Sequence, residues 1–188
     1  YNTNLSRLNY KTNNIFDYWK QFSNISVGAS IDASGQVAEY MRHGTVWQDI
    51  IDNINAIKIN TPHVNLFIAS TVSWPTLENL IELQTDWIRT GLFTRDQLTM
   101  HALVEPGYLS VTTLPDSYKQ SMTIKINKHI DHIGQCELAQ SWEELRNFMN
   151  ATNTQYELAE FTKRTMTLDK HRKESFASVF PQFTDLFL

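Results

Sequence analysis

The chain has 188 residues, of which 41% are hydrophobic and 19% charged, so one globular domain, or one domain with an appendage, is expected. The net charge of −4 argues against general nucleic-acid binding, and no apolar run is long enough to span a bilayer. Neither nucleic acid nor a membrane is therefore an expected partner. The single cysteine, Cys136, excludes an intrachain disulfide and suits a cytoplasmic location.

The first half of the chain alternates predicted strands and helices. Apolar, β-branched runs predict buried strands, and apolar residues spaced by three, four and seven predict amphipathic helices. In chain order we predict a helix over 15–22 capped by Asn14, a strand over 25–31, a helix from Thr45 to Pro62, a strand over 64–72, a helix between Thr76 and Gly91, and a strand over 97–104. These units have the length of parallel βαβ crossovers, and right-handed crossovers in one direction form an arc of a barrel.

The second half of the chain reads as helical. After Pro106-Gly107 the pattern predicts a helix over 115–133, a second over 142–149 and a third from 154 or 155 to about 172. Ser141 is the predicted N-cap of the second helix, and Glu144 completes a capping box. No strand is predicted in this half.

Polar residues follow the first buried strand and form the first candidate site. Ser30 and Asp32 come at the carboxyl end of this strand, and Arg42 follows ten residues after Asp32. In parallel α/β folds, ligands bind where strands end, because the loops there can present polar groups. The alternatives are a local turn in which Asp32 caps its own backbone, and a solvated Arg42 beside Glu39.

Several segments together resemble the radical S-adenosylmethionine enzymes, in the branch with a twitch- or SPASM-like C-terminal region, which includes the anaerobic sulfatase-maturating enzymes. The segments Ser30-Ile31-Asp32 and Glu39-Tyr40-Met41-Arg42, with the helix from Thr45, are similar to the fourth strand and fourth helix of that family. The other similar segments are 1–4 (end of the third strand), 69–73 (fifth strand), 102–106 with 114–115 (sixth strand and its exit), and 168–172 with 180–181 (C-terminal tail). The ordered set carries the resemblance, which covers nearly the whole chain.

The resemblance implies an α/β fold. Residues 1–112 would form about half of a partial parallel (β/α)6 barrel, corresponding to strands 3 to 6 of the family fold, and residues 113–188 a helical C-terminal extension. Arg42 matches an arginine that holds the carboxylate of S-adenosylmethionine in related maturases, a task that suits the two-point donor geometry of a guanidinium. The expected cofactor-binding residues are Thr3, Asn4, Ser30, Asp32, Arg42, Thr71, Ser73, Leu103 and Val104.

Some of these positions have simpler explanations. Thr3 and Asn4 could be a frayed terminus, and Leu103 and Val104 could be ordinary strand core. Thr71 and Ser73 are expected to point the same way, because side chains on a strand repeat with a period of two. Ser73 could instead cap the following helix.

The family's cluster motif is missing from the sequence. That motif is C-x3-C-x2-C followed by Gly-Gly-Glu-Pro, and this chain has one cysteine. In the family, a [4Fe–4S] cluster reduces S-adenosylmethionine to a radical that abstracts hydrogen from a substrate. We therefore expect the C-terminal part of a longer enzyme, or a truncated relative, which contributes cofactor-binding residues and part of the substrate wall. As it stands, the chain is expected to be inactive and to bind no cluster through its cysteine.

The sequence does not identify catalytic residues or the substrate. A peptide is one candidate substrate, because that branch of the family often modifies peptides. The alternative function is a non-catalytic α/β domain that binds a small molecule or a protein and has lost the cluster half.

Two further expectations concern metal binding and assembly. His129, His132 and Cys136 have a ligand-like spacing, but no fourth ligand is evident and a solvated helix face is the favoured interpretation. The incomplete barrel is expected to expose apolar strand residues and an unpaired edge, which predicts a homodimer. The alternative is a monomer whose C-terminal helices cover the open face.

Overall fold

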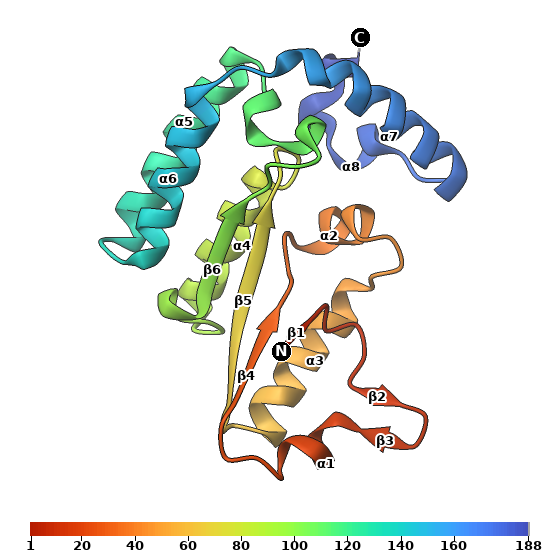
Figure 1. The fold of residues 1–188 in the computed structure, drawn as a ribbon, viewed down its shortest axis with the longest axis vertical. Helices are drawn as coiled ribbons and strands as arrows, with labels where there is room; N and C mark the ends of the chain where they lie inside the picture. Colours follow the sequence, from red (N-terminus) through yellow and green to blue (C-terminus); the bar gives the residue numbers. More distant parts are fainter. Residues whose placement is uncertain (188) are drawn as a thin grey trace.

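Four parallel strands form the central sheet of the protein, in the order β1-β4-β5-β6 (Figure 1). The computed structural model describes residues 1–187. The strands of this sheet are β1 (Asn2–Thr3), β4 (Ile25–Ala29), β5 (Val64–Val72) and β6 (Leu98–Ala102), and a separate hairpin pairs β2 (Asn9–Tyr10) with β3 (Asn13–Asn14). The register pairs Gly28 with Phe67, and Thr71 with His101.

Helices make up most of the rest of the structure. The α-helices are α1 (Ile15–Trp19), α2 (Gly35–Met41), α3 (Trp47–Asn60), α4 (Leu77–Thr90), α5 (Asp116–Ile133), α6 (Glu137–Ala151), α7 (Leu158–Arg172) and α8 (Phe176–Val179). Short 3-10 helices are η1 (Arg95–Gln97), η2 (Gly107–Leu109), η3 (Val111–Thr113), η4 (Gln155–Glu157) and η5 (Pro181–Phe187). No helix in the described range 1–187 has the length and apolar character needed to cross a membrane.

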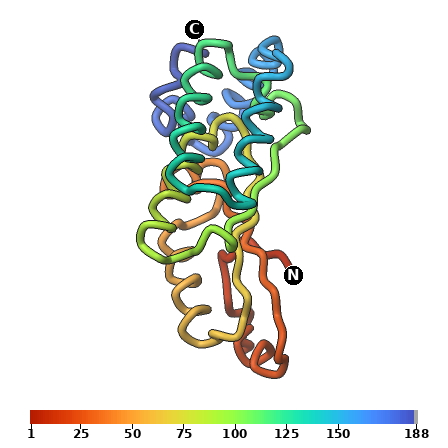
Figure 2. Tube along the Cα trace, turned by 90° about the vertical axis from the view of Figure 1, so that its left-hand side faces the viewer, coloured from red at the N-terminus to blue at the C-terminus, as the bar shows by residue number. Residues whose placement is uncertain are grey.

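One face of the sheet is covered by helices and the other is open. On β5, the alternate residues Val64, Leu66 and Ile68 are buried, whereas Asn65 and Thr71 are exposed. Helix α4 lies behind β5 and β6 in Figure 1, and the view turned by 90° shows α3 and α4 on the same side of the strands (Figure 2). A parallel sheet is normally covered on both faces, so the open face is unusual.

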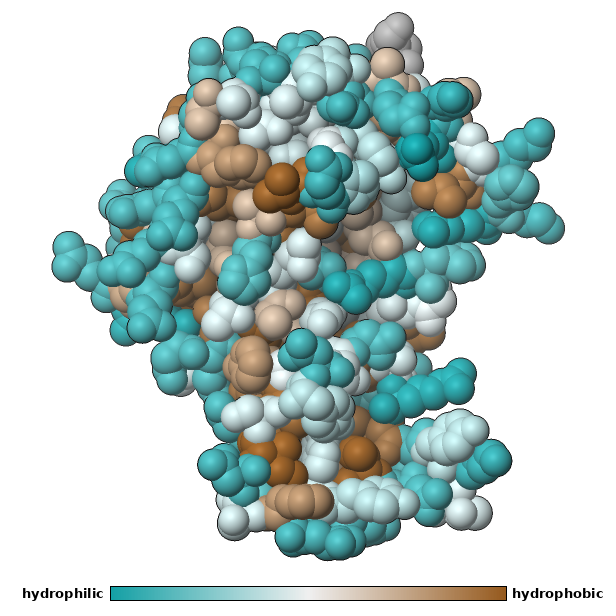
Figure 3. Space-filling view, viewed as in Figure 1, coloured by the Kyte–Doolittle hydropathy of each residue, from teal (hydrophilic) through white to brown (hydrophobic). Residues whose placement is uncertain are grey.

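The open face is mostly polar. The residues that register and alternation place on it are Asn2, Ser26, Gly28, Asn65, Phe67, Ala69, Thr71, Thr99 and His101. The expected exposure of apolar strand residues is therefore wrong, because Val27, Leu66, Ile68, Leu98 and Met100 pack in the core. Seen from the direction of Figure 1, the surface is largely hydrophilic, with apolar residues in small groups (Figure 3).

The second half of the chain encloses the carboxyl end of the sheet. Helices α7 and α8 lie beyond the arrowheads of β4 and β5, and α5 and α6 run beside β6 (Figure 1). The buried ring of Trp74, two residues after β5, packs edge-on against Phe161, Phe176 and Phe183. This aromatic cluster ties the C-terminal helices to the end of β5.

The expected α/β class is confirmed, and the sheet is parallel as predicted. Strand β5 has the predicted bounds, whereas β4 ends at Ala29, before the predicted Ile31. In residues 1–187 the sheet stays open, with β1 and β6 at its edges. A partial barrel of the family type remains an expectation.

Several details of the helix prediction are wrong, including the end of α1 at Trp19 instead of residue 22 and the start of α3 at Trp47 instead of Thr45. Helix α2 was not predicted, because Ser34-Gly35 reads as a strand breaker and the helix has only seven residues. Ser141 is not an N-cap: α6 begins at Glu137, after Cys136, and the Ser141 hydroxyl donates to the Glu137 carbonyl inside the helix. Serine can make this bond within a helix, so the residue type alone did not fix its position.

Candidate functional site

The predicted site residues lie along one edge of the sheet. Thr3 ends β1 and Asn4 follows it, Ser30 and Asp32 follow β4, Thr71 and Ser73 lie at the end of β5, and Leu103 and Val104 follow β6. Because the four strands are parallel, all these positions are at the carboxyl edge. Ligands of α/β proteins bind at this edge.

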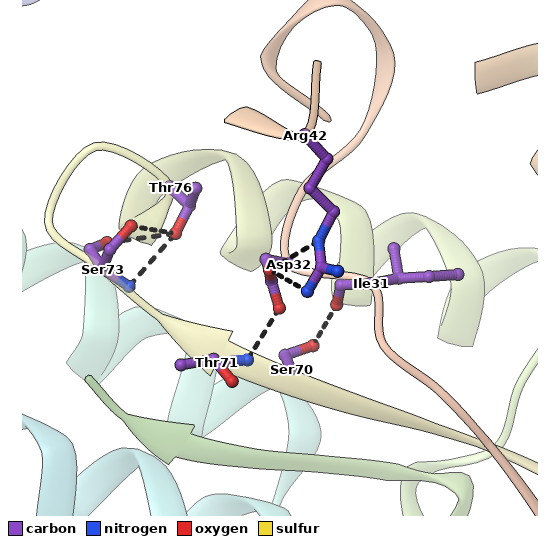
Figure 4. A network of polar contacts seen from close by, with 7 residues as sticks. All are labelled: Ile31, Asp32, Arg42, Ser70, Thr71, Ser73 and Thr76. Atoms are coloured by element: carbon purple, nitrogen blue, oxygen red, sulfur yellow. Dashed lines mark hydrogen bonds and ion pairs between the residues drawn. The ribbon is translucent and has the colours of Figure 1, made fainter. Parts of the chain in front are cut away.

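A charged pair forms the centre of this edge (Figure 4). The Arg42 guanidinium donates to Oδ2 of Asp32 from Nε at 3.0 Å and from Nη2 at 2.6 Å. The other carboxylate oxygen, Oδ1, accepts the backbone N–H of Thr71 at 2.8 Å. Asp32 thus links the end of β4 to β5 and fixes the Arg42 head, so its role is to position other groups.

Three polar groups at the same edge remain available to a ligand. Within residues 1–187, the hydroxyls of Ser30 and Thr71 make no hydrogen bond, and Nη1 of Arg42 is not used by Asp32. The Arg42 side chain is 38% exposed. Hydroxyl oxygens and a guanidinium nitrogen together can bind a carboxylate and its neighbouring polar atoms.

Ser30 and Arg42 line a common hollow, as predicted, but the hollow is nearly full. Its volume is about 10 Å³, and its walls include Ile31, Met41 and Trp47. A space of that size is at the lower limit for one water molecule. A ligand that uses these groups must therefore bind on the open side of the edge rather than inside this hollow.

Ser73 does not face the site. Strand β5 ends at Val72, so the alternation that would align Ser73 with Thr71 stops before it. Ser73 is buried, and its N–H donates to Oγ1 of Thr76 at 3.3 Å while its carbonyl accepts the Thr76 hydroxyl at 3.1 Å. The capping alternative is also wrong, because the N-cap residue of α4 is Thr76 and not Ser73.

Thr3 and Asn4 serve local turns. Oγ1 of Thr3 accepts the N–H of Leu5 at 3.1 Å, and Oδ1 of Asn4 accepts the N–H of Ser6 at 3.1 Å. The Thr3 carbonyl accepts the N–H of Ser30 at 2.8 Å, which extends the β1–β4 pairing past Ala29. Thr3 and Asn4 therefore stabilise the backbone at this edge, and their side-chain oxygens are already used in these turns.

Leu103 and Val104 differ in exposure. The N–H of Leu103 donates to the Val72 carbonyl at 2.9 Å, and its side chain is partly buried. Val104 is 59% exposed beyond β6. Val104 therefore offers an apolar surface at the edge, and Leu103 continues the strand.

The cysteine lies at the opposite end of the sheet. Cys136 is in the turn between α5 and α6, and Arg95, just before β6, donates to the Ile133 carbonyl at that turn. The turn is therefore at the amino end of β6, away from Arg42. Among the described residues, no group of three or more His, Cys, Asp or Glu side chains is placed to hold a metal ion.

The interpretation of His129 as part of a solvated helix face is wrong. The residue is 3% exposed, and its ring packs edge-on against Trp142 at 5.3 Å between centroids. Nδ1 lies 3.1 Å from Oγ1 of Thr85, and Nε2 lies 3.3 Å from Oε1 of Gln84. Burial, with a smaller contribution from His132, lowers the pKa of His129 to about 4. His132 is exposed, as expected.

Sequence reasoning missed a larger cavity beside this edge. It has a volume of about 580 Å³ and lies between α2, η2 and α7. The Tyr40 hydroxyl donates to Oδ1 of Asp169 at 2.7 Å and so joins α2 to α7. Burial and the Asp169 carboxylate raise the pKa of Tyr40 above its usual range. The cavity was missed because its walls include α2, which was not predicted, and residues more than 100 positions apart.

Comparison of the chain with models of protein families, with curated proteins and with solved structures finds no match in any of the three.

Proposed function

We propose that this chain contributes S-adenosylmethionine-binding residues and part of the substrate wall to a radical S-adenosylmethionine enzyme. One observation supports the proposal most strongly. Within residues 1–187, the Ser30 and Thr71 hydroxyls make no hydrogen bond and Nη1 of Arg42 is not used by Asp32, and these groups lie at the carboxyl edge of a parallel sheet whose adjoining face is open and polar. In α/β folds, this is the edge that binds ligands.

The residues at the edge fit the chemistry of the cofactor. Its amino-acid carboxylate needs a cation, which Nη1 of Arg42 can supply while Asp32 holds the rest of the guanidinium. The hydroxyls of Ser30 and Thr71 can bond to the amino group or the ribose, and the exposed Val104 can contact the adenine. Ser30 follows β4, Thr71 lies on β5 and Val104 follows β6, so these three groups are in the order of the strands, and Arg42 at the end of α2 is held beside them by Asp32. This arrangement suits an elongated ligand lying across the edge.

The residues do not fit an iron–sulfur cluster. A [4Fe–4S] cluster needs several thiolates, and the one cysteine of the sequence lies at the amino end of β6. In this proposal the cluster cysteines are supplied by residues outside this sequence. The chain itself binds and orients the cofactor.

Calorimetric titration of the full chain tests the proposal. We expect S-adenosylmethionine to bind with one site per chain, and we expect Arg42→Gln to weaken binding about tenfold, because the carboxylate loses a charged donor. Methylthioadenosine lacks the amino-acid part, so the same substitution should barely change its affinity. Ser30→Ala should weaken binding less, by a few-fold.

Arg89→Gln is the matched control, because Arg89 is an exposed arginine that also pairs with a carboxylate, Asp86, but lies near the end of α4. It should leave both affinities unchanged. The proposal is wrong if S-adenosylmethionine does not bind at millimolar concentration. The proposal is also wrong if Arg42→Gln weakens binding of methylthioadenosine as much as it weakens binding of S-adenosylmethionine.

The rival function is a non-catalytic α/β domain that binds a small molecule or a protein. The cavity of about 580 Å³ favours this alternative, because it is a formed ligand-sized space that does not include Ser30 or Arg42. Binding of a ligand in that cavity, with no binding of S-adenosylmethionine at the carboxyl edge, would favour the rival.

The expected homodimer remains a proposal. The open face is polar, so it does not supply the apolar contact that was expected to drive dimerisation. The short free edge at β1 is what supports a dimer. Light scattering at micromolar concentration measures the oligomeric state directly. A monomeric mass would show that the expected dimer does not form.

A further inference from the structure

A ligand-sized cavity lies between the second and seventh helices, α2 and α7. Its volume of about 580 Å³ is within the range of small-molecule sites, about 300 to 1,000 Å³. Tyr40 and Met41 of α2 form one wall, Tyr108 and Leu109 of η2 a second, and residues of α7 a third. The Tyr40–Asp169 hydrogen bond joins two of these walls, α2 and α7.

The inner walls are aromatic. Phe161 and Phe176 are buried with their rings 5.2 Å apart between centroids, and the Tyr108 ring lies 6.5 Å from Phe161. Aromatic surfaces of this kind stack on flat apolar ligands. Leu168 is 43% exposed and extends the apolar surface outward.

The rim is basic. Lys163, Arg164 and Arg172 line the cavity, with Glu160 as the one acidic residue among the lining residues. Arg164 pairs with Glu160 and lies over the Tyr108 ring, and Nη1 of Arg172 bonds the Tyr40 carbonyl at 3.4 Å. Lys163 makes no ion pair with any residue in the range 1–187, so its charge is available.

The charge of α7 is unusual for this protein. The helix carries four lysine and arginine residues against two acidic residues, whereas the whole chain has a net charge of −4. A basic rim on an acidic protein attracts anions.

We propose that this cavity binds a small anionic aromatic molecule. Its ring system lies on Phe161, Phe176 and Tyr108, and its carboxylate, sulfonate or phosphate contacts Lys163 at the mouth. Met41 separates this cavity from the small hollow at Asp32 and Arg42, since it lines both. The inference does not rest on the proposed function, which concerns the carboxyl edge of the strands.

Fluorescence titration of the full chain with 1-anilinonaphthalene-8-sulfonate, an aromatic anion, tests the proposal, with the neutral N-phenyl-1-naphthylamine as the comparison ligand. We expect saturable binding of the anion at one site. Lys163→Gln should weaken binding of the anion about two- to fivefold, as expected for the loss of one exposed ion pair. It should leave the affinity for the neutral ligand unchanged. Leu168→Glu should weaken binding of both ligands by more than about fivefold, because it removes apolar surface and adds a negative charge.

Two substitutions on the same helix are matched controls. Lys170 is exposed and Met166 is 66% exposed, and neither lines the cavity. Lys170→Gln and Met166→Glu should therefore change neither affinity. Near-UV circular dichroism of each variant must match that of the parent protein, because a loosened core would also bind the dye. Absence of saturable binding, tighter binding of the neutral ligand, or equal effects of Lys163→Gln and Lys170→Gln would each overturn the proposal.

Discussion

The carboxylate of Asp32 joins two strand ends, because its Oδ1 accepts the backbone N–H of Thr71 at 2.8 Å. Its other oxygen holds Arg42, and the side chain is 16% exposed. The same aspartate therefore both links the segment after β4 to the end of β5, beyond their last paired residues, and fixes the candidate cofactor-binding arginine. Removing it should disturb stability and the site together.

Asp32→Ala should lower the free energy of unfolding by about 1–3 kcal/mol, because it leaves a backbone donor and a guanidinium without their acceptor. Asp86→Ala is the control: Asp86 pairs with Arg89 on the exposed surface, and its loss should cost less than about 0.5 kcal/mol. Urea unfolding of the three proteins measures the difference. Equal losses for the two variants would mean that Asp32 is an ordinary surface acid.

Gly28 allows the Phe67 ring to lie against β4 on the open face. A Cβ at position 28 would lie 2.5 Å from Oδ1 of Asn2 and 2.9 Å from Cζ of Phe67. Gly28→Ala should therefore lower the free energy of unfolding by about 1–3 kcal/mol through overpacking. Adding Phe67→Leu should recover part of the loss, because the smaller side chain can move away from the new methyl group.

Gly107→Ala is the control for this substitution, since a Cβ there would meet Glu157 at an ordinary 3.5 Å. It should change stability by less than about 1 kcal/mol. Urea unfolding of the single and double variants gives the coupling between positions 28 and 67. If Gly28→Ala is neutral, or if Phe67→Leu does not relieve it, the close approach of the ring to β4 does not limit this position.

The sequence predicted the sheet better than the site. The run from Val64 to Val72 is rich in apolar and β-branched residues, so its strand and its bounds follow from local composition. The position of Asp32 at the carboxyl edge follows as well, because a strand end and parallel connections determine it. Its bond to Thr71 does not follow, because that bond depends on the register of β4 against β5.

Other features depend on contacts that no local pattern contains. His129 looks like a surface residue beside His132, yet the packing of α6 against α4 and α5 buries it with Trp142. The cavity between α2 and α7 likewise needs Tyr40 and Asp169 to meet across 129 positions. Such long-range packing is decided by the whole fold, so periodicity cannot reveal it.

The Tyr40–Asp169 hydrogen bond should stabilise the joint between α2 and α7. Tyr40→Phe removes the hydroxyl and should lower the free energy of unfolding by about 1 kcal/mol. The substitution should also weaken binding of the anionic dye in the cavity, because the α2 wall is no longer hydrogen-bonded to α7. Tyr156→Phe is the control, since Tyr156 is 75% exposed and its hydroxyl makes no hydrogen bond within residues 1–187. If the two variants have the same stability, the bond does not hold the helices.

The buried imidazole of His129 should make the protein less stable in mild acid. Its pKa in the folded protein is about 4, against about 6.5 in an unfolded chain. Between these values the unfolded chain takes up a proton that the folded protein refuses, so stability falls as the pH drops from about 7 towards 4. A shift of this size corresponds to a loss on the order of 3 kcal/mol over that window.

Urea unfolding at several pH values, for the parent protein and two variants, measures this contribution. His129→Gln should lower stability at pH 7.5 but flatten its decline in acid, because the glutamine does not titrate. His132→Gln is the control: His132 is exposed and three residues away, so its replacement should leave most of the decline in place. Should His129→Gln fail to fold, the ring proton resonances of the parent protein give the same answer. A His129 resonance that titrates near pH 6.5 in the folded state would show that the ring is accessible to water and that its burial does not set the acid limit of stability.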